Sequence, residues 1–524
     1  MHKTTEELRA LEANAEYLGL SKLQMMENAG LSLADEIMKR FKKPANVVIF
    51  CGVSGNGGDG FVAARHLAGQ GYHVKVLVFG EDRDIVADEV RANWEILKSM
   101  DKTIDLQLIG EHSEILLAPS PEIVVDAMVG LGIRGVLRAN LKKAVDAVNA
   151  CKGFKVAVDV PSGIEPDTGQ VMGVAVKADL TVSFHSAKNG FQAAKEYVGE
   201  LVVRRVGIPE EAEAYAGPGD VELATIRRKA DAHKGECGRV LVVGGSELYS
   251  GAPALSALGA YRAGVDLVYI ACPEPVANAI AGFSPSLIVS RLDGPFLSGK
   301  NMTTIQQLLG RSDSLIIGPG LGTREETSEA VRSIIEMTEE VGVPIVIDAD
   351  AIKVFARWKR KLRCGAILTP HRGEFETLSN RSLPSDPRLV PEAVRSEAEK
   401  TDATVLLKGR VDIISDGVHV KLNRTGNAGM TVGGTGDVLA GVAAAYLAKG
   451  VAPFRAGVAA AFVNGAAGDL AARERGYHLL PTDLLEHLPQ AMDNPMGHRP
   501  IAREKWTKRE EGKDHRIFLS SSFT

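Results

Sequence analysis

The stretch from Asn427 to Gly441 reads NAGMTVGGTGDVLAG and passes directly into an alanine-rich apolar segment. Gly433, Gly434 and Gly436 lack a Cβ, so the backbone can approach a ligand while the N–H groups opening the next helix face an anion. Asp437 stands where this loop becomes helix, which places a potential base for a hydroxyl or a water beside the anion. Because glycine turns and Asp caps also occur without ligands, the stretch alone favours a phosphate site and an ordinary helix start about equally.

Further polar groups of the second half follow predicted strands. His371 and Glu374 come after a strand in GAILTPHRGEF, and Lys408 follows a strand in ATVLLKG. A lone histidine is more often structural than catalytic, and a strand-end lysine can be a solvated charge. A Lys-Gly step shortly before a phosphate loop nevertheless suits a nucleotide contact. These residues therefore predict a second-domain site around Asp437.

The unusual polar residues of the first half also follow predicted strands. They are Asn56, Asp59, Asp126, Asp159 and Ser162. Each alone is more simply a helix cap, but ligands bind beyond the carboxyl ends of parallel strands, so three such loops together favour a site. Asn56, Asp126 and Ser162 offer hard oxygen ligands, which suit an alkali or an alkaline-earth cation without separating the two.

The elements that must position these residues have an α/β pattern. Short β-branched apolar runs predict buried parallel strands at 46–52, 73–80, 123–130 and 155–163, with a glycine loop (SGNGGDG) after the first. Helical spacing is expected at 5–41, 84–99 and 137–151. A Rossmann-like, doubly wound parallel sheet is the expected fold of this half.

A fresh α/β pattern begins near residue 238. Strands are predicted at 238–246, 265–275, 314–323 and 344–352, with an alanine-rich helix at 251–264. Between them, the acidic, turn-rich segment 208–234 is the candidate boundary. We therefore expect domains at 1–218 and 219–493, followed by a polar, flexible tail at 494–524.

Composition limits the function further. A chain of 524 residues exceeds what one core usually serves, and a net charge of −5 gives no basic surface that would suggest nucleic acid. Five cysteines without a CxxC pair argue against a disulfide framework or a structural zinc site and for a reducing cytoplasm. The first residues do not resemble a signal peptide and no apolar run is long enough for a membrane span, so a soluble cytoplasmic protein is expected.

Taken together, these motifs resemble the bifunctional NAD(P)H-hydrate repair enzymes over nearly everything except the tail. The first half is similar to their epimerase domain in LEANAEYLGLSKLQMMENAG, SGNGGDG, DAMVGLGIRG, DVPSGIEPDTG and TVSFHSAKNG. The second half is similar to their dehydratase domain, of ribokinase-like α/β/α fold, in HKGECGRVLVVGGS, GPGLG, DADAI, TPHRGEF, LKG and NAGMTVGGTGDVLAG.

The resemblance implies that the first domain interconverts the R and S hydrates of NADH and NADPH and that the second dehydrates the S form. It implies catalytic roles for Asp159 and Asp437, and a K+ ion at Asn56, Asp126 and Ser162. Implied hydrate contacts in the epimerase are Gly55, Asn56, Gly57, Gly58, Asp59, Gly130, Leu131, Gly132, Ile133, Arg134, Gly135, Val136 and Asp159. Those in the dehydratase are Ala252, Gly320, His371 and Asp437. Implied nucleotide contacts are Lys408, Gly409, Arg410, Val411, Asp412, Asn427, Ala428, Gly429, Met430, Thr431, Val432, Gly433, Gly434, Thr435 and Gly436.

The resemblance also implies the nucleotide: family members with this two-domain arrangement use ADP, so ADP with Mg2+ is expected, and AMP and phosphate are the expected products. The expected partners are the NADH and NADPH hydrates, ADP and further copies of the chain in a homo-oligomer, with neither nucleic acid nor a membrane. The sequence departs from the family at Ser54 and Gly55, because the family commonly has Gly and Asn there, and at Glu165, where Asp is more usual.

Two other functions fit parts of the pattern. A small-molecule kinase shares the GGTGD loop, and product analysis by mass would separate it from a dehydratase. A non-catalytic scaffold of RNA decapping shares the first domain, but such proteins tend to lose the acidic strand-end residues, and Asp126 and Asp159 are present here.

Overall fold

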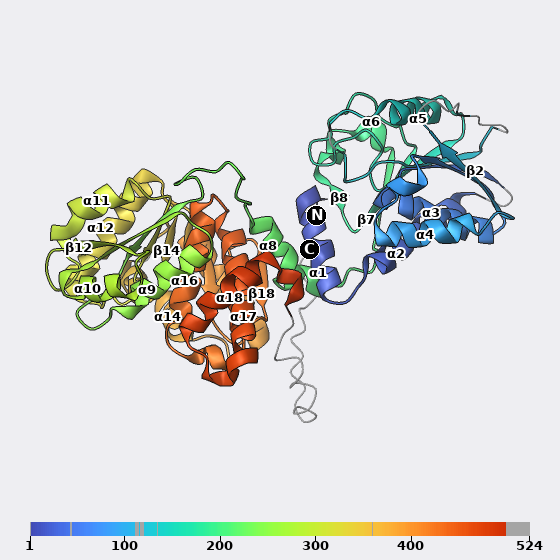
Figure 1. The fold of residues 1–524 in the computed structure, drawn as a ribbon. Coiled ribbons are helices and arrows are strands. Elements are labelled where there is room, and N and C mark those ends of the chain that lie inside the picture. The colour runs from blue at the N-terminus through green and yellow to red at the C-terminus, as the bar shows by residue number, and fades with distance from the viewer. Residues whose placement is uncertain are drawn as a thin grey trace. The chain divides into compact units, whose positions relative to one another are not determined.

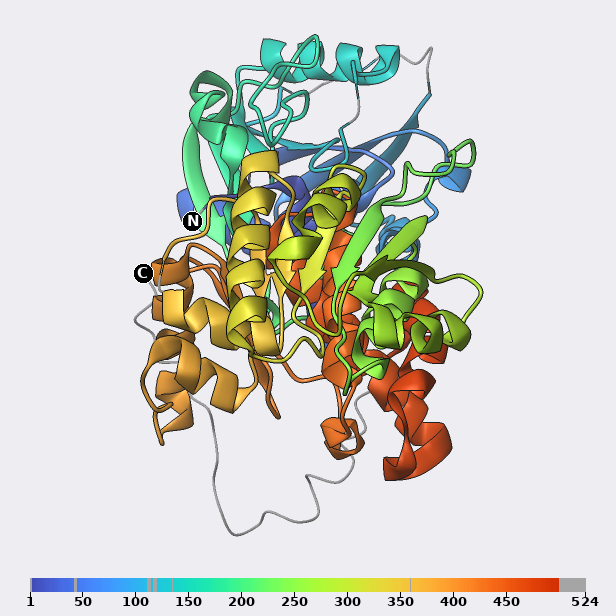
Figure 2. The same cartoon turned by 90° about the vertical axis from the view of Figure 1, so that its left-hand side faces the viewer.

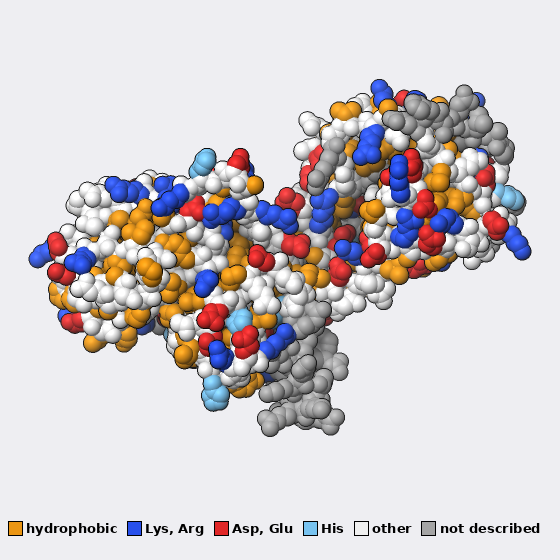
Figure 3. Space-filling view, in the orientation of Figure 1, with side chains coloured by type: hydrophobic (Ala, Val, Ile, Leu, Met, Phe, Trp, Pro, Cys, Tyr) orange, Lys and Arg blue, Asp and Glu red, His pale blue; other side chains and the backbone are white. Residues whose placement is uncertain are grey.

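The computed structural model describes residues 2–41, 45–110, 115, 120–133, 135–358 and 360–498. The chain divides into two compact units, Met1–Glu210 and Glu211–Thr524 (Figure 1). Each unit has its own sheet and its own buried core. Figure 3 shows acidic and basic side chains intermixed on the visible face of each unit, as the small net charge of −5 leads one to expect.

The sequence analysis expected the boundary after residue 218, whereas the two units divide after residue 210. The segment from residue 211 to residue 218 belongs to the second unit because it already contacts that unit. The N–H of Ala216 donates to the carbonyl of Leu422 over 2.7 Å. Lys421 forms an ion pair with Asp220 in α8 (Pro218–Ala224).

The first unit has a seven-stranded sheet in which all neighbouring strands are parallel, in the order β4-β3-β2-β5-β6-β7-β9. The strands are β2 (Asn46–Cys51), β3 (His73–Phe79), β4 (Ile104–Ile109), β5 (Ile123–Ala127), β6 (Phe154–Val158), β7 (Leu180–Phe184) and β9 (Glu200–Arg204). Strand order reverses between β2 and β5, which is the point where such sheets bind ligands. The expected doubly wound sheet is confirmed.

Helices cover both faces of this sheet. They are α2 (Lys22–Arg40), α3 (Gly55–Gly69), α4 (Asp88–Lys98) and α5 (Ala139–Ala150). The same unit also contains α1 (Thr5–Tyr17) and the short α6 (Lys195–Val198), and α7 (Glu210–Ala214) begins the segment that leads into the second unit. Alternate residues of β2 face α2, α3 and α4 on one side, as Ile49 does, and α5 on the other, as Phe50 does. The expected SGNGGDG loop is wrong in one respect, because Gly55–Asp59 already form the first turn of α3.

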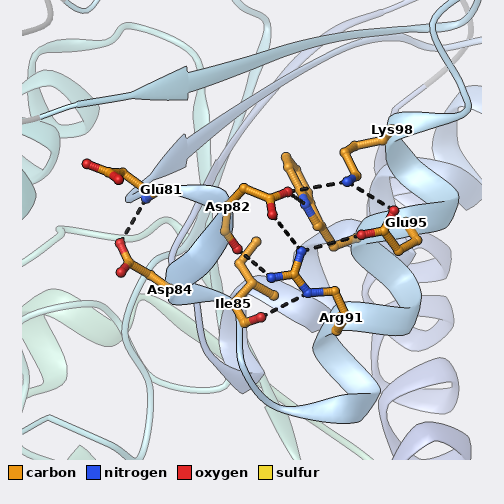
Figure 4. A network of polar contacts seen from close by, with 8 residues as sticks. Glu81, Asp82, Asp84, Ile85, Arg91, Glu95 and Lys98 are labelled. Carbon is orange, nitrogen blue, oxygen red and sulfur yellow. Dashed lines mark hydrogen bonds and ion pairs between the residues drawn. The ribbon is translucent and has the colours of Figure 1, made fainter.

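A polar network ties the turn after β3 to α4 (Figure 4). Asp82 accepts hydrogen bonds from Trp94 Nε1 at 2.6 Å, Arg91 Nη1 at 2.9 Å and Lys98 Nζ at 3.3 Å. These hydrogen bonds, first that of Trp94, lower the pKa of Asp82. The network therefore keeps Asp82 ionised and fixes α4 over the sheet.

The second unit has a nine-stranded mixed sheet in the order β12-β11-β10-β13-β14-β15-β16-β17-β18. The strands are β10 (Arg239–Val243), β11 (Leu267–Pro273), β12 (Ile288–Leu292), β13 (Ser314–Ile317), β14 (Ile345–Ile347), β15 (Ala366–Leu368), β16 (Thr404–Leu407), β17 (Asp412–Ser415) and β18 (Val420–Asn423). Strands β12 to β16 pair in parallel, whereas β17 and β18 form an antiparallel edge that the sequence analysis did not anticipate.

Helices lie on both sides of this sheet as well (Figure 2). They are α9 (Gly251–Arg262), α10 (Glu274–Phe283), α11 (Met302–Leu309), α12 (Glu325–Val341), α13 (Asp350–Trp358), α14 (Arg372–Ser379), α15 (Val390–Thr401), α16 (Thr435–Ala448), α17 (Pro453–Arg475) and α18 (Pro481–Asp493). Helices α11, α12 and α13 pack on one face, and α16, in contact with α9 and α17, packs on the other. The α/β/α layering therefore agrees with the expected ribokinase-like architecture.

The expected tail at 494–524 is wrong for its first residues. Pro495–Gly497 form a short 3-10 helix, and His498 is 3% exposed because it pairs with the buried Asp469. Residues 499–524 lie outside the described part of the chain. None of the helices in the described part has the length and apolarity that crossing a membrane requires.

Candidate active sites

In the first unit, Asp126 and Ser162 lie together at the carboxyl ends of β5 and β6. The Oγ of Ser162 donates to Oδ1 of Asp126 over 2.6 Å, and the Ser162 N–H donates to Oδ2 over 2.7 Å. Burial raises the pKa of Asp126 to about 6, although the hydrogen bonds from Ser162 and Met128 oppose the shift. Asp126 is thus a buried carboxylate whose charge a cation would stabilise.

Asn56 comes to the same sheet edge from the first turn of α3. Its Nδ2 donates to the carbonyl of Val158 over 3.1 Å. A Cβ on Gly130 would lie 2.6 Å from Oδ1 of Asn56, so only glycine allows this approach. The oxygens of Asn56, Asp126 and Ser162 fit the donor chemistry of a K+ ion, and the buried Asp126 supplies its charge.

Asp159 takes a strained conformation directly after β6, with φ of 61°. Its carboxylate accepts a hydrogen bond from the N–H of Phe184 at 2.9 Å and forms an ion pair with Lys188. Lys188 is 1% exposed and also donates to Ser183 Oγ at 3.0 Å and to the carbonyl of Ser186 at 3.3 Å. Sequence reasoning missed Lys188, although it lies in the quoted TVSFHSAKNG motif.

Two further acids belong to the same electrostatic cluster. Burial, followed by the charges of Asp159 and Glu12, raises the pKa of Asp59 well above its usual range. Burial and then Asp159 also raise the pKa of Glu12, which comes from α1 and was missed by sequence reasoning. Lys188 opposes both shifts. The site therefore combines two acids of raised pKa with the lysine-paired Asp159.

The other expected epimerase contacts differ in how tightly they pack and how exposed they are. Gly57 packs so closely that a Cβ would lie 1.9 Å from the carbonyl oxygen of Gly52, whereas a Cβ on Gly55 would meet open space. In the loop after β5, the carbonyl of Leu131 accepts from Arg9 at 3.0 Å, and Val136 is 73% exposed. Gly58 is buried, Ile133 is partly exposed, Gly132 and Gly135 are exposed, and Arg134 lies outside the described residues.

In the second unit, the expected glycine loop ends at the N-terminus of α16. Gly434 is the residue before the helix, with φ of 107°, a conformation that favours glycine. Asp437 lies in the first turn. Burial raises its pKa to about 7; Asp348 and Glu374 add to the shift and Lys408 opposes it. Asp437 is therefore poised to exchange a proton near neutral pH.

Lys408 reaches over the start of α16. A Cβ on Gly436 would lie 3.2 Å from Nζ of Lys408, and the same Nζ donates to Oδ1 of Asp348 over 3.1 Å. Burial lowers the pKa of Lys408, but Asp348 and Glu374 outweigh it and raise the pKa overall. Thr369 Oγ1 also donates to Oδ1 of Asp348, at 2.7 Å. Sequence reasoning assigned neither Asp348 nor Thr369, although Asp348 opens the quoted DADAI motif.

The expected contacts from Lys408 to Asp412 form the turn between β16 and β17. Gly409 and Arg410 are exposed and Val411 is partly exposed. The carboxylate of Asp412 accepts from the Gly409 N–H at 2.9 Å and from Asn423 Nδ2 at 2.9 Å, while burial raises its pKa to about 6. Asp412 thus shapes the turn.

His371 caps helix α14. Its ring Nδ1 accepts from the backbone N–H of Glu374 at 3.2 Å, and the backbone N–H of His371 donates to the Glu374 carboxylate at 2.9 Å. The imidazole remains 60% exposed, so the structural role leaves the ring accessible. Gly320 and Ala252 adjoin each other, since a Cβ on Gly320 would lie 3.7 Å from that of Ala252.

The loop from Asn427 to Gly436 is held at both ends. Asn427 Nδ2 donates to the carbonyl of Gly468 and to Oδ1 of Asp469, both at 3.0 Å. Thr435 Oγ1 donates to the carbonyl of Met430 at 2.9 Å. In between, Ala428–Thr431 form a 3-10 turn around the buried Gly429, Val432 is partly exposed, and Gly433 is exposed.

Each of the two α/β units has acids at the ends of its strands. In the second unit, one acid lies beside a lysine at a glycine-rich helix start. These features define a two-domain enzyme that binds a nucleotide. Residues 22–190 match the family model of the YjeF-related protein N-terminus, and residues 240–490 match that of NAD(P)H-hydrate dehydratase.

Full-length relatives agree with this class. The chain is 46% identical over 499 residues to a bifunctional NAD(P)H-hydrate repair enzyme of Pyrobaculum aerophilum, covering 93% of this chain and 97% of that protein. It is 44% identical over 503 residues to the enzyme of the same name from Hyperthermus butylicus, covering 94% and 92%. The chain therefore belongs to the family of bifunctional NAD(P)H-hydrate repair enzymes, with an epimerase domain and a dehydratase domain. This assignment favours repair over the kinase and scaffold alternatives.

A solved structure similar to the second unit is the ADP/ATP-dependent NAD(P)H-hydrate dehydratase of Bacillus subtilis, co-crystallised with ATP and Mg2+. It is 27% identical, covers 54% of this chain and 98% of its own, and has a TM-score of 0.47.

Proposed function

We propose that the first unit interconverts the R and S hydrates of NADH and NADPH, and that the second dehydrates the S hydrate with ADP. The observation that carries the proposal is Asp437, whose pKa is raised to about 7 at the start of α16, beside Lys408. A base with this pKa, next to donors for phosphate, suits phosphoryl transfer to a hydroxyl.

In the proposed dehydration, Asp437 removes the proton of the hydrate hydroxyl. The resulting oxygen attacks the β-phosphorus of ADP, the bond from that phosphorus to the bridging oxygen breaks, and AMP leaves. Phosphate is a far better leaving group than hydroxide, so the C–O bond then breaks as a proton is lost from the neighbouring carbon, and the ring double bond returns. The N–H groups opening α16 and Lys408 Nζ stabilise the phosphate charge. Mg2+, when bound to the nucleotide, would neutralise further phosphate charge.

In the proposed epimerisation, the carbon bearing the hydroxyl loses that group and regains it on the opposite face. Asp59, whose pKa burial raises, donates a proton to the departing oxygen, and Asp159 accepts a proton from the water that adds. The ion pair with Lys188 holds the Asp159 carboxylate in its strained position. A K+ ion held by Asn56, Asp126 and Ser162 would supply positive charge for the hydrate oxygens. The remaining contacts expected in both domains, 1–218 and 219–493, belong to this proposal.

The direct test is incubation of the full chain with mixed NADH hydrates and ADP. We expect the nicotinamide absorbance to return, with AMP and phosphate formed in equal amounts. ATP in place of ADP tests the nucleotide preference, and a stable phosphorylated product would contradict the dehydration.

Two expectations stay predictions. Five free cysteines suit a cytoplasmic enzyme, which fractionation of the source cells would test. Sedimentation of the purified chain would test the expected homo-oligomer.

A further inference from the structure

The entry to the loop Asn427–Gly436 rests on one buried carboxylate, that of Asp469 in α17. Its Oδ2 accepts from the Gly426 N–H at 3.0 Å, and its Oδ1 accepts from Asn427 Nδ2 at 3.0 Å. Asn427 Oδ1 in turn accepts from the Gly429 N–H at 2.9 Å. The carboxylate therefore fixes the backbone and the side chain at the point where the loop begins.

The third hydrogen-bond partner of Asp469 is His498, which follows helix α18 in the chain. His498 Nε2 lies 2.9 Å from Oδ2 of Asp469, and the two side chains are 2% and 1% exposed. The His498 ring also makes an edge contact with Phe462, with ring centres 5.6 Å apart. A histidine buried against a carboxylate donates its N–H and limits how that carboxylate can turn.

His498 is itself held in place by the segment before it. Asn494 Oδ1 accepts from the Gly497 N–H at 3.1 Å, which closes the short Pro495–Gly497 helix. That helix contacts α8 and α18, and Pro495 is buried. The ring is thus delivered to Asp469 by a packed segment.

We infer that His498 is a positioning residue for nucleotide binding, acting through Asp469 on the entry to the glycine loop. The inference rests on the proposed function, in which Asn427–Gly436 bind ADP. Without the imidazole donor, the buried Asp469 carboxylate loses one of its three hydrogen bonds. The carboxylate can then rotate, so it no longer holds Gly426 and Asn427 in one arrangement. Asp437 stands on α16, beyond the far end of the loop, and keeps its place.

The test compares His498→Ala with His498→Gln in the full chain, measuring ADP affinity by calorimetry and dehydration by steady-state kinetics. The alanine variant removes the donor, so we expect Kd and KM for ADP to rise about ten-fold, while kcat at saturating ADP changes less than about two-fold. The glutamine amide retains a donor of similar reach and should restore most of the affinity. The epimerase rate and the melting temperature of the first unit serve as controls.

A structural role alone would lower stability and activity together, and glutamine would not restore affinity. Unchanged ADP affinity in the alanine variant, or glutamine binding as weakly as alanine, would overturn the inference. Should the alanine variant not fold, Asp469→Asn carries the test, since its amide places a donor against another donor. That variant must also weaken ADP binding, and normal affinity would overturn the inference. If the wild-type chain binds no ADP, the proposed function itself fails.

Discussion

Lys408 Nζ lies 3.1 Å from Oδ1 of Asp348. The same Nζ lies beside Gly436 in the first turn of α16, where its charge acts on Asp437. Lys408 therefore interacts with two carboxylates: it forms an ion pair with Asp348, and Asp437 is the carboxylate that can exchange a proton near neutral pH. Burial is the main cause that raises the pKa of Asp437; Asp348 adds to this shift and Lys408 opposes it, so the pair adjusts the proton affinity of the proposed base.

Asp437→Asn should abolish dehydration while keeping ADP affinity. The amide retains the shape at the helix start but cannot take a proton, and a positioned base contributes about a hundred- to ten-thousand-fold to the rate. Single-turnover assays with S hydrate and calorimetry with ADP measure the two effects. Epimerisation in the same variant should be unchanged. Wild-type dehydration would show that Asp437 is not the base.

Dehydration should depend on pH through Asp437. The acid form dominates below its pKa of about 7, so kcat should rise as pH increases through 7 and then level off. In Asp348→Asn a negative neighbour is lost, which lowers the pKa of Asp437, and the rising limb should move to lower pH. Arg324→Gln, at an exposed ion pair with Glu247, is a control that should leave the limb in place. A limb that moves to higher pH would contradict this coupling.

Potassium should stabilise the first unit through Asp126. Burial raises the folded-state pKa of Asp126 to about 6, so without a cation this group lowers stability as pH rises from about 4 to about 6. A cation favours the charged form, and K+ should therefore raise the melting temperature at pH 7.5 and have little effect below pH 4.

The matched variants are Asp126→Asn and Asp412→Asn, because burial raises the pKa of both acids to about 6 in different units. Only Asp126→Asn should lose the response to K+. Tetramethylammonium chloride controls for ionic strength. An equal response in all three proteins would remove K+ from the site.

Asp159→Asn should separate the two activities. With ADP and a mixed hydrate pool, the variant should clear the S fraction quickly and then show only slow, uncatalysed epimerisation. The wild type should clear the whole pool, because the first unit supplies S hydrate continuously. Following absorbance over time distinguishes two phases from one. A single complete phase in the variant would mean that Asp159 does not serve epimerisation.

Much of this architecture was predictable because it depends on local pattern. Apolar β-branched runs gave the strands, and glycine motifs marked the loops at their ends. The helical start at Gly55–Asp59 was not predictable, because glycine-rich segments have low helix propensity and the close packing of Gly57 against Gly52 is a tertiary contact. The antiparallel pairing of β17 and β18 also escaped prediction.

The missed site residues have a common cause. Lys188 and Asp348 are buried charges, and their burial is favourable only because partners far along the chain, Asp159 and Lys408, meet them. Spacing in the sequence does not give such pairings. The same holds for His498, which lies in a polar stretch but is buried against Asp469.

The hydrogen bond from Ala216 to Leu422 has a consequence for association between chains. β18 ends the second sheet, and an open strand edge can pair with another chain and lead to aggregation. Tyr215 bridges to Leu422 at this edge, so the connecting segment shields part of it. A fragment that begins at residue 219 would expose the edge, whereas one that begins at 211 would keep its cover.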